Sequence, residues 1–77
     1  MQYQVEVFEP HRQQTTRKII HVRTEFAIWP QVVETARRLS GNSDARIRVR
    51  DEKGEVVVLT SAAAALRVSS EYEQSAA

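Results

Sequence analysis

The first residues of the chain alternate between apolar and polar side chains with the period of a β-strand. Within residues 2–8, QYQVEVF, the apolar residues Tyr3, Val5 and Val7 share one face, and Gln2, Gln4 and Glu6 lie on the other. Such alternation predicts a strand with one buried side and one side open to solvent. Three later segments also predict strands: residues 17–23, 45–50 and 55–60.

The segment between the first two predicted strands is polar and contains proline. Residues 9–16, EPHRQQTT, therefore predict a long, mobile hairpin loop. In the strand that follows, Ile20 and Val22 are expected to face the core, which leaves Arg17 and Arg23 on the opposite side.

After residue 26 the apolar residues change to helical spacing. One stripe is formed by Ile28, Val32, Val33, Ala36 and Leu39. Pro30 fits only the first turn, where its missing N–H needs no partner, so the helix is expected to begin near residues 27–29. Phe26 and Trp29 are expected to seal the start of this helix against the sheet.

Two further features belong to the surface and the end of this helix. Glu34 and Arg38 have the spacing of an i,i+4 ion pair on its solvent side. Ser40 and Gly41 follow, and Gly41 is suited to the left-handed conformation that commonly ends a helix.

A tight turn is predicted between the last two strands. Glu52-Lys53-Gly54 fits a three-residue loop closed by a glycine with positive φ. Asp51 precedes it and can stabilise the turn through its side-chain carboxylate.

The alanine-rich segment 62–68 predicts a second, short helix capped by Ser61 and anchored by Leu66. Residues 69–77 are expected to fray. The predicted order is therefore ββαββα in a single small α+β domain, residues 1–77, with no internal repeat or linker. One mainly antiparallel four-stranded sheet would pack on the central helix.

Composition narrows the class of protein. A chain of 77 residues without cysteine, 42% apolar and 27% charged, is typical of one small globular domain. It has no disulfides or thiolate metal site to supplement its core. The longest apolar run is too short to span a membrane, and no signal peptide opens the chain. The expectation is a soluble, cytoplasmic protein without membrane contact.

The residue types needed for catalysis are not grouped in this sequence. His11 and His21 have no cysteine or carboxylate cluster at metal-ligand spacing. The acidic pair Asp51-Glu52 falls in a turn, where turn chemistry explains it. We therefore expect no catalytic, metal or cofactor-binding residues and no enzymatic activity; an enzyme subunit or an accessory protein is a third alternative.

The net charge of +1 hides an uneven distribution. Nine basic residues and three acidic ones lie within residues 11–50, whereas both ends of the chain are acidic. Nine of the eleven basic residues are arginine, which favours planar, bidentate contacts. A basic middle could attract nucleic acid, pair with an acidic surface across a dimer, or simply be a solvated mixed surface.

The two faces of the last hairpin differ in character. With a three-residue loop the expected core face consists of Ile47, Val49, Val57 and Leu59, and the expected other face of Arg46, Arg48, Arg50, Val56 and Val58. A four-residue loop would exchange which apolar pair points outward. Either a partner covers this surface, or the arginine stems themselves shield the valines.

The segment DEKGEVVVLTS resembles the C-terminal half of the Phox/Bem-type interaction domain, a ubiquitin-like β-grasp. The matching positions are Asp51, Glu52, Gly54, Glu55, Val57, Leu59, Thr60 and Ser61. The resemblance covers only residues 51–61 and implies a β-grasp-like fold. Lys53, Ala62 and Ala64 stand where that family has acidic residues, so the resemblance implies the fold more than the family's acidic-to-basic mode of pairing.

These features together predict a small non-enzymatic protein–protein interaction module whose partner is another protein or a second copy in a homodimer. The expected partner-binding residues are Arg17, Arg23, Arg46, Arg48, Arg50, Val56 and Val58. The alternative is a nucleic-acid-binding protein whose sheet arginines contact phosphates. A near-neutral net charge and a lack of exposed aromatic residues on the sheet, with Phe8 the only candidate near a rim, weigh against it.

Overall fold

The structure, a computed structural model, describes residues 1–39 and 44–68. Its elements are β1 (Gln2–Glu9), β2 (Gln14–His21), a 3-10 turn (Glu25–Ala27), α1 (Ile28–Arg38), β3 (Arg46–Arg50) and β4 (Val56–Ser61), followed by helical residues 62–68. The predicted α+β class and the ββαββα order are confirmed.

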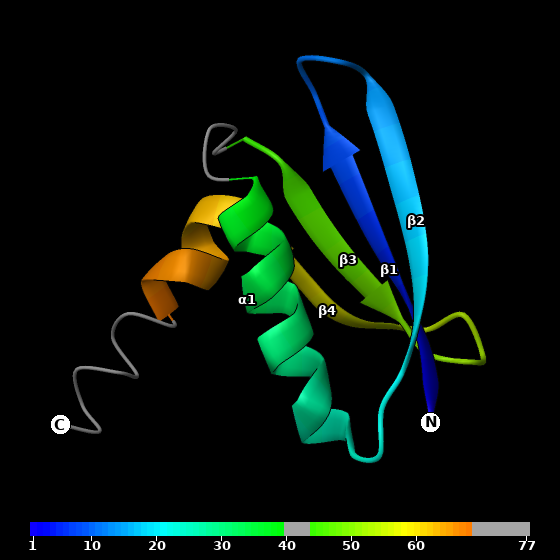
Figure 1. Ribbon diagram of the computed structural model, residues 1–77. Coiled ribbons are helices and arrows are strands. Elements are labelled where there is room, and N and C mark those ends of the chain that lie inside the picture. The colour runs from blue at the N-terminus through cyan, green and yellow to red at the C-terminus, as the bar shows by residue number, and fades with distance from the viewer. Residues whose placement is uncertain (40–43, 69–77) are drawn as a thin grey trace, which may run out of the picture.

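The four strands form one antiparallel sheet in the order β2-β1-β3-β4, and α1 lies across one of its faces (Figure 1). The core fills the space between this helix and the sheet. It consists of Tyr3, Val5, Val7, Ile20, Ile28, Val32, Ala36, Ala45, Ile47, Val49, Ala62 and Ala65. The opposite face of the sheet has no helix over it in the described chain.

The central helix follows its sequence pattern closely. Its predicted stripe is buried, with Leu39 half-buried at its end. The Arg38 guanidinium and the Glu34 carboxylate are 2.9 Å apart, as their spacing predicts. The prediction for Phe26 is wrong: its side chain is 91% exposed because the 3-10 turn directs it to solvent. Trp29 is half-buried and does pack on the core.

The β1–β2 connection is shorter than predicted. Gln13 adopts a positive φ of 49°, and the Gln13 N–H donates to the Pro10 carbonyl at 3.2 Å, which closes a tight turn. β2 therefore begins at Gln14 and ends at His21, three residues earlier than the polar pattern indicated at its start. Only Ile20 of this strand is buried, so its polar first half pairs with β1 without entering the core.

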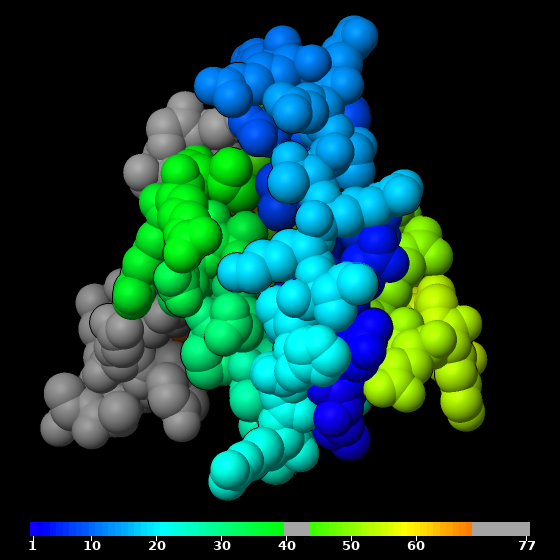
Figure 2. Space-filling model, turned by 45° about the vertical axis from the view of Figure 1, so that its right-hand side comes forward, coloured from blue at the N-terminus to red at the C-terminus, as the bar shows by residue number. Residues whose placement is uncertain are grey.

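The β3–β4 turn has the predicted chemistry. Gly54 has φ 84°, and the Asp51 carboxylate accepts hydrogen bonds from the Lys53 and Glu55 N–H groups, both at 2.9 Å. The Glu52 carboxylate accepts a bond of 3.1 Å from the Gln2 N–H. The turn accordingly lies beside the start of β1, yellow-green against dark blue in Figure 2.

A β-bulge changes the predicted pairing of the last hairpin. Arg50 pairs with Val56 as expected, but Val49 pairs with Val58 and Arg48 with Leu59, so Val57 is the extra residue. The expected placement of Val57 and Leu59 in the core and of Val58 among the arginines is therefore wrong. The side chain of Leu59 is 69% exposed, whereas Val58 packs against the core.

The end of the described chain closes the core. The Ser61 hydroxyl accepts a hydrogen bond of 3.0 Å from the Ala64 N–H, which confirms the predicted cap. Ala62 and Ala65 are fully buried, and the predicted anchor Leu66 is half-buried beside them. The predicted Gly41 cap and the expected frayed segment 69–77 lie outside the described residues.

Candidate interaction surface

The sheet surface opposite α1, here called the outer face, carries three cross-strand rows of side chains. The rows are Ile19, Gln4, Arg50 and Val56; then Arg17, Glu6, Arg48 and Leu59; then Thr15, Phe8, Arg46 and Ser61. Each row takes one residue from each strand, in the order β2, β1, β3, β4. The rows alternate with the buried residues of β1 and β3, so they face away from the helix.

Glu6 lies at the centre of the outer face and forms ion pairs with three arginines. Its carboxylate oxygens are 3.1 and 3.2 Å from two guanidinium nitrogens of Arg48, and 2.7 Å from Nε of Arg50. From the other side, Nε of Arg17 lies at 3.3 Å. One carboxylate therefore fixes guanidinium groups from β2 and β3 over β1.

Glu6 is only 5% exposed although the arginines around it are partly open to solvent. The hydrogen bond from Arg48 lowers the pKa of this carboxyl, burial opposes that change, and the bond from Arg50 lowers the pKa further. The net direction is downward. Glu6 is therefore ionised across the physiological range and acts as the fixed anchor of the cluster.

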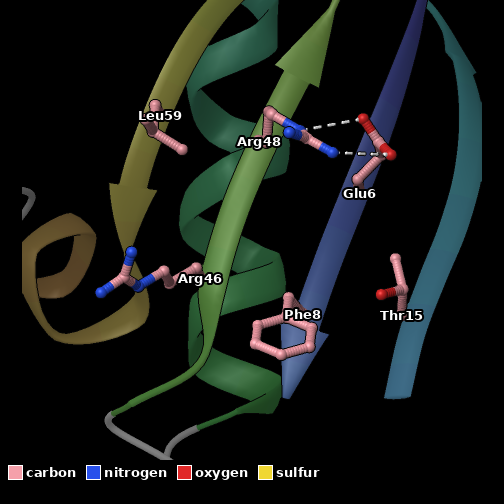
Figure 3. Close-up of a pocket in the computed structure, with 6 residues that line it drawn as sticks. All are labelled: Glu6, Phe8, Thr15, Arg46, Arg48 and Leu59. Carbon is pink, nitrogen blue, oxygen red and sulfur yellow. Dashed lines mark hydrogen bonds and ion pairs between the residues drawn. The ribbon is translucent and has the colours of Figure 1, made fainter. Parts of the chain in front are cut away.

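Beside this cluster the outer face has a hollow of about 340 Å³ (Figure 3). It is lined by Glu6, Phe8, Thr15, Arg46, Arg48 and Leu59. Figure 3 shows Arg48 directed toward Glu6, while Arg46 extends the opposite way, across β4. Phe8 and Leu59 supply apolar walls, and their side chains are 43% and 69% exposed.

The outer face combines positive charge with exposed apolar side chains. Its four arginines outnumber its single glutamate and leave three positive charges. Exposed apolar side chains from all three rows lie between them: Phe8, Ile19, Val56 and Leu59. Holding guanidinium groups in place lowers the entropy lost when they bind, and apolar side chains gain from being covered. The arrangement is suited to binding a surface that offers carboxylates and apolar side chains.

Most of the predicted partner-binding residues come together. The outer face carries Arg17, Arg46, Arg48, Arg50 and Val56. Arg23 lies beyond the end of β2 and is not part of the three rows. Val58 lies on the helix side, so its expected position on this surface is wrong.

Glu6 and Leu59 are parts of this surface that sequence reasoning did not assign to it. Glu6 was recognisable only as a polar residue of the first strand, because its pairing with Arg48 depends on β1 lying beside β3. Leu59 was assigned to the core because the bulge is not visible in a run of three valines. The alternation of β1 was a usable signal for Phe8, since it places Phe8 and Glu6 on the same face.

Away from the outer face, His11 lies beside a carboxylate. His11 Nε2 and Asp44 Oδ2 are 3.3 Å apart on the surface, both exposed. Within residues 1–39 and 44–68, no group of three or more His, Cys, Asp or Glu residues could hold a metal ion. No helix in that part of the chain is long and apolar enough to cross a membrane.

In comparisons with known proteins, no family model, curated protein or solved structure matches the chain. The resemblance of residues 51–61 to the Phox/Bem-type domain therefore stays a prediction, and functional reasoning depends on the outer face itself.

Proposed function

We propose that this protein is a small non-enzymatic interaction module that binds a protein partner through its outer face. The observation that carries the proposal is the Glu6 cluster, in which one buried carboxylate positions Arg17, Arg48 and Arg50 beside an open hollow with two apolar walls. Arginine and aromatic side chains are enriched where protein interfaces concentrate their binding energy.

The charge of the outer face indicates the kind of partner. Three excess positive charges favour a protein surface that carries carboxylates around an apolar patch. The apolar part would enter the hollow between Phe8 and Leu59, while carboxylates would meet Arg46 and the exposed edges of the cluster. A second copy presenting the same face would bring like charges together, so stacking of two outer faces is disfavoured.

The test is quantitative capture from a cell extract with the full chain as bait. Phe8→Asp is expected to reduce retention of the bound protein at least tenfold, because it places a charge in the hollow. Val68→Asp is the matched control, since Val68 is an apolar residue of similar exposure that lines neither hollow. Equal retention by the wild type and Phe8→Asp would contradict the proposal, provided that circular dichroism finds both folded.

A second variant tests the charged part of the surface. Arg48→Glu removes one guanidinium from the cluster and should weaken capture of the same protein, whereas Lys53→Glu in the β3–β4 turn should not. Lys53 does not line the hollow, so equal effects of the two variants would indicate a general charge effect rather than a defined site.

Binding of nucleic acid is the alternative function, and one observation favours it. Phe8 is exposed on the outer face next to Arg46, a combination that can stack a base and contact a phosphate. Fluorescence anisotropy with mixed-sequence single-stranded DNA and RNA at low salt tests it. Binding that weakens steeply with salt and is lost in Phe8→Asp would favour this alternative; no binding at low salt would exclude it.

A further inference from the structure

The two edges of the sheet are protected to different degrees. β2 forms one edge and carries Arg17, Lys18 and His21, all of them exposed. β4 forms the other edge, and its six residues, Val56–Ser61, include no charged residue and no proline. Charged residues and prolines are the usual means of preventing one sheet edge from pairing with another, so β2 is protected and β4 is open.

The backbone of β4 is oriented for pairing. The Ala62 N–H donates to the Ala45 carbonyl at 2.9 Å, so this group points toward β3. Because N–H groups alternate along a strand, those of Leu59 and Ser61 point away from the sheet. No strand of the described chain lies beyond them. The bulge at Val57 lies nearer the other end of the strand and leaves Val58–Ser61 regular.

Apolar side chains flank this edge on both sides of the sheet. On the outer face, Leu59 is 69% exposed. On the helix side, a hollow of about 610 Å³ is lined by Glu25, Phe26, Ile28, Trp29, Pro30, Val57 and Val58. A strand added at β4 would therefore cover apolar surface above and below the edge.

The charges at the two ends of β4 are opposite. The β3–β4 turn, before the strand, carries Asp51, Glu52 and Glu55 against Lys53. At the far end, Arg46 pairs with Ser61 and extends across β4 toward the open edge (Figure 3). An antiparallel arrangement of two identical strands places the acidic end of each beside the basic end of the other. The edge is thus complementary to itself.

We infer that a second copy of this chain pairs with β4, antiparallel and centred on Leu59, to give one continuous eight-stranded sheet. The two-fold axis is perpendicular to the sheet, so both outer faces lie on the same side and form one extended surface. Residues with outward N–H groups exchange both backbone bonds when directly opposite, at a Cα separation of about 5.5 Å. The inference shares Arg46 and Leu59 with the proposed outer-face site, but it depends on the open backbone edge of β4 and not on the hollow.

Single-cysteine cross-linking tests this pairing directly, because the chain contains no cysteine of its own. A Cα separation of about 5.5 Å lies in the range that a disulfide accepts. Leu59→Cys should form the disulfide dimer at least tenfold faster than Ile19→Cys under mild oxidation. Ile19 is the matched control: it lies on the same face, at 57% exposure, but on the protected edge strand. Equal rates for the two variants would overturn the inference.

Light scattering of protein without an introduced cysteine gives a second measurement of dimer formation. The wild type and Ile19→Lys are expected to be dimers at tens of micromolar, and Leu59→Lys a monomer, because it sets two positive charges directly opposite each other. A monomeric wild type at the same concentration would overturn the inference. Capture of the outer-face partner by a monomeric wild type would still support the proposed function, so the two can fail separately.

Exchanging two charges tests whether Arg46 of one copy lies close to Glu55 of the other copy. Arg46→Glu should raise the dimer dissociation constant at least tenfold. The double variant Arg46→Glu, Glu55→Arg should bring the dissociation constant most of the way back to the wild-type value. Both side chains lie on the surface, so neither change removes core packing. A double variant no tighter than Arg46→Glu would mean that the charges do not meet across the dimer, and the antiparallel register would be wrong.

Discussion

At the scale of single residues, Glu6 is the side chain on which the outer face depends. Its carboxylate is 5% exposed and is the common partner of Arg17, Arg48 and Arg50. Glu6→Gln keeps the size of the side chain but removes the charge. We expect the free energy of unfolding to fall by about 1–3 kcal/mol, since the arginines lose charge-assisted hydrogen bonds while remaining partly hydrated. Urea unfolding measures this, with the exposed Glu25→Gln expected within about 0.5 kcal/mol of the wild type.

The lowered pKa of Glu6 also predicts how stability depends on pH. A carboxyl whose pKa is lower in the folded state stabilises the fold fully above its unfolded pKa, near 4.5 for an ordinary glutamate. That contribution is lost as the pH falls below this value and through the folded pKa. The difference in unfolding free energy between the wild type and Glu6→Gln should therefore be constant near neutral pH and shrink under acid conditions. A difference that grew toward low pH would contradict the assignment.

At the scale of elements, regular patterns were predictable and register was not. The stripe of α1, the Asp51 and Gly54 chemistry of the turn and the Ser61 cap each follow from local sequence. β1 alternates from Gln2 to Val7, and Tyr3, Val5 and Val7 face the core as predicted, although Glu6 on the other face is also buried. In contrast, three consecutive valines give β4 no alternation to fix its pairing, so the bulge exchanged Val58 and Leu59 between the two faces.

The bulge gives a direct prediction about those two positions. Val58 packs on the core, so Val58→Ala should cost about 1–2 kcal/mol of stability through lost burial and an imperfectly filled space. Leu59→Ala removes more atoms but from an exposed side chain, and should cost less than Val58→Ala. Chemical denaturation of both variants tests the register. Pairing without a bulge would bury Leu59 in place of Val58, so Leu59→Ala would then cost more stability than Val58→Ala. The assay needs dilute protein so that dimerisation does not contribute.

At the scale of the whole molecule, the outer face exists because the core is completed on one side only. α1 and the helical residues 62–68 enclose the core from the same face of the sheet, and the arginine rows occupy the other (Figure 1). Neither the strand order nor the meeting of Glu6 with Arg48 can be read from the sequence, since both arise from β1 lying between β2 and β3. The sequence shows that the middle of the chain is basic, but it does not show that three of the arginines pair with the same carboxylate, that of Glu6.

A domain of this size has a stability of only about 4–11 kcal/mol, so its last helical turns matter to the whole fold. Ala65 is fully buried where residues 62–68 close the core. Ala65→Glu would force a carboxylate into apolar surroundings and should cost at least about 3 kcal/mol. Ala63→Glu is the matched control, because Ala63 lies in the same helical segment but is exposed. Thermal unfolding should lose cooperativity or shift far downward in Ala65→Glu alone. If both variants melt like the wild type, residues 62–68 are not part of the cooperative core, and the sheet and α1 are sufficient to hold the outer face in place.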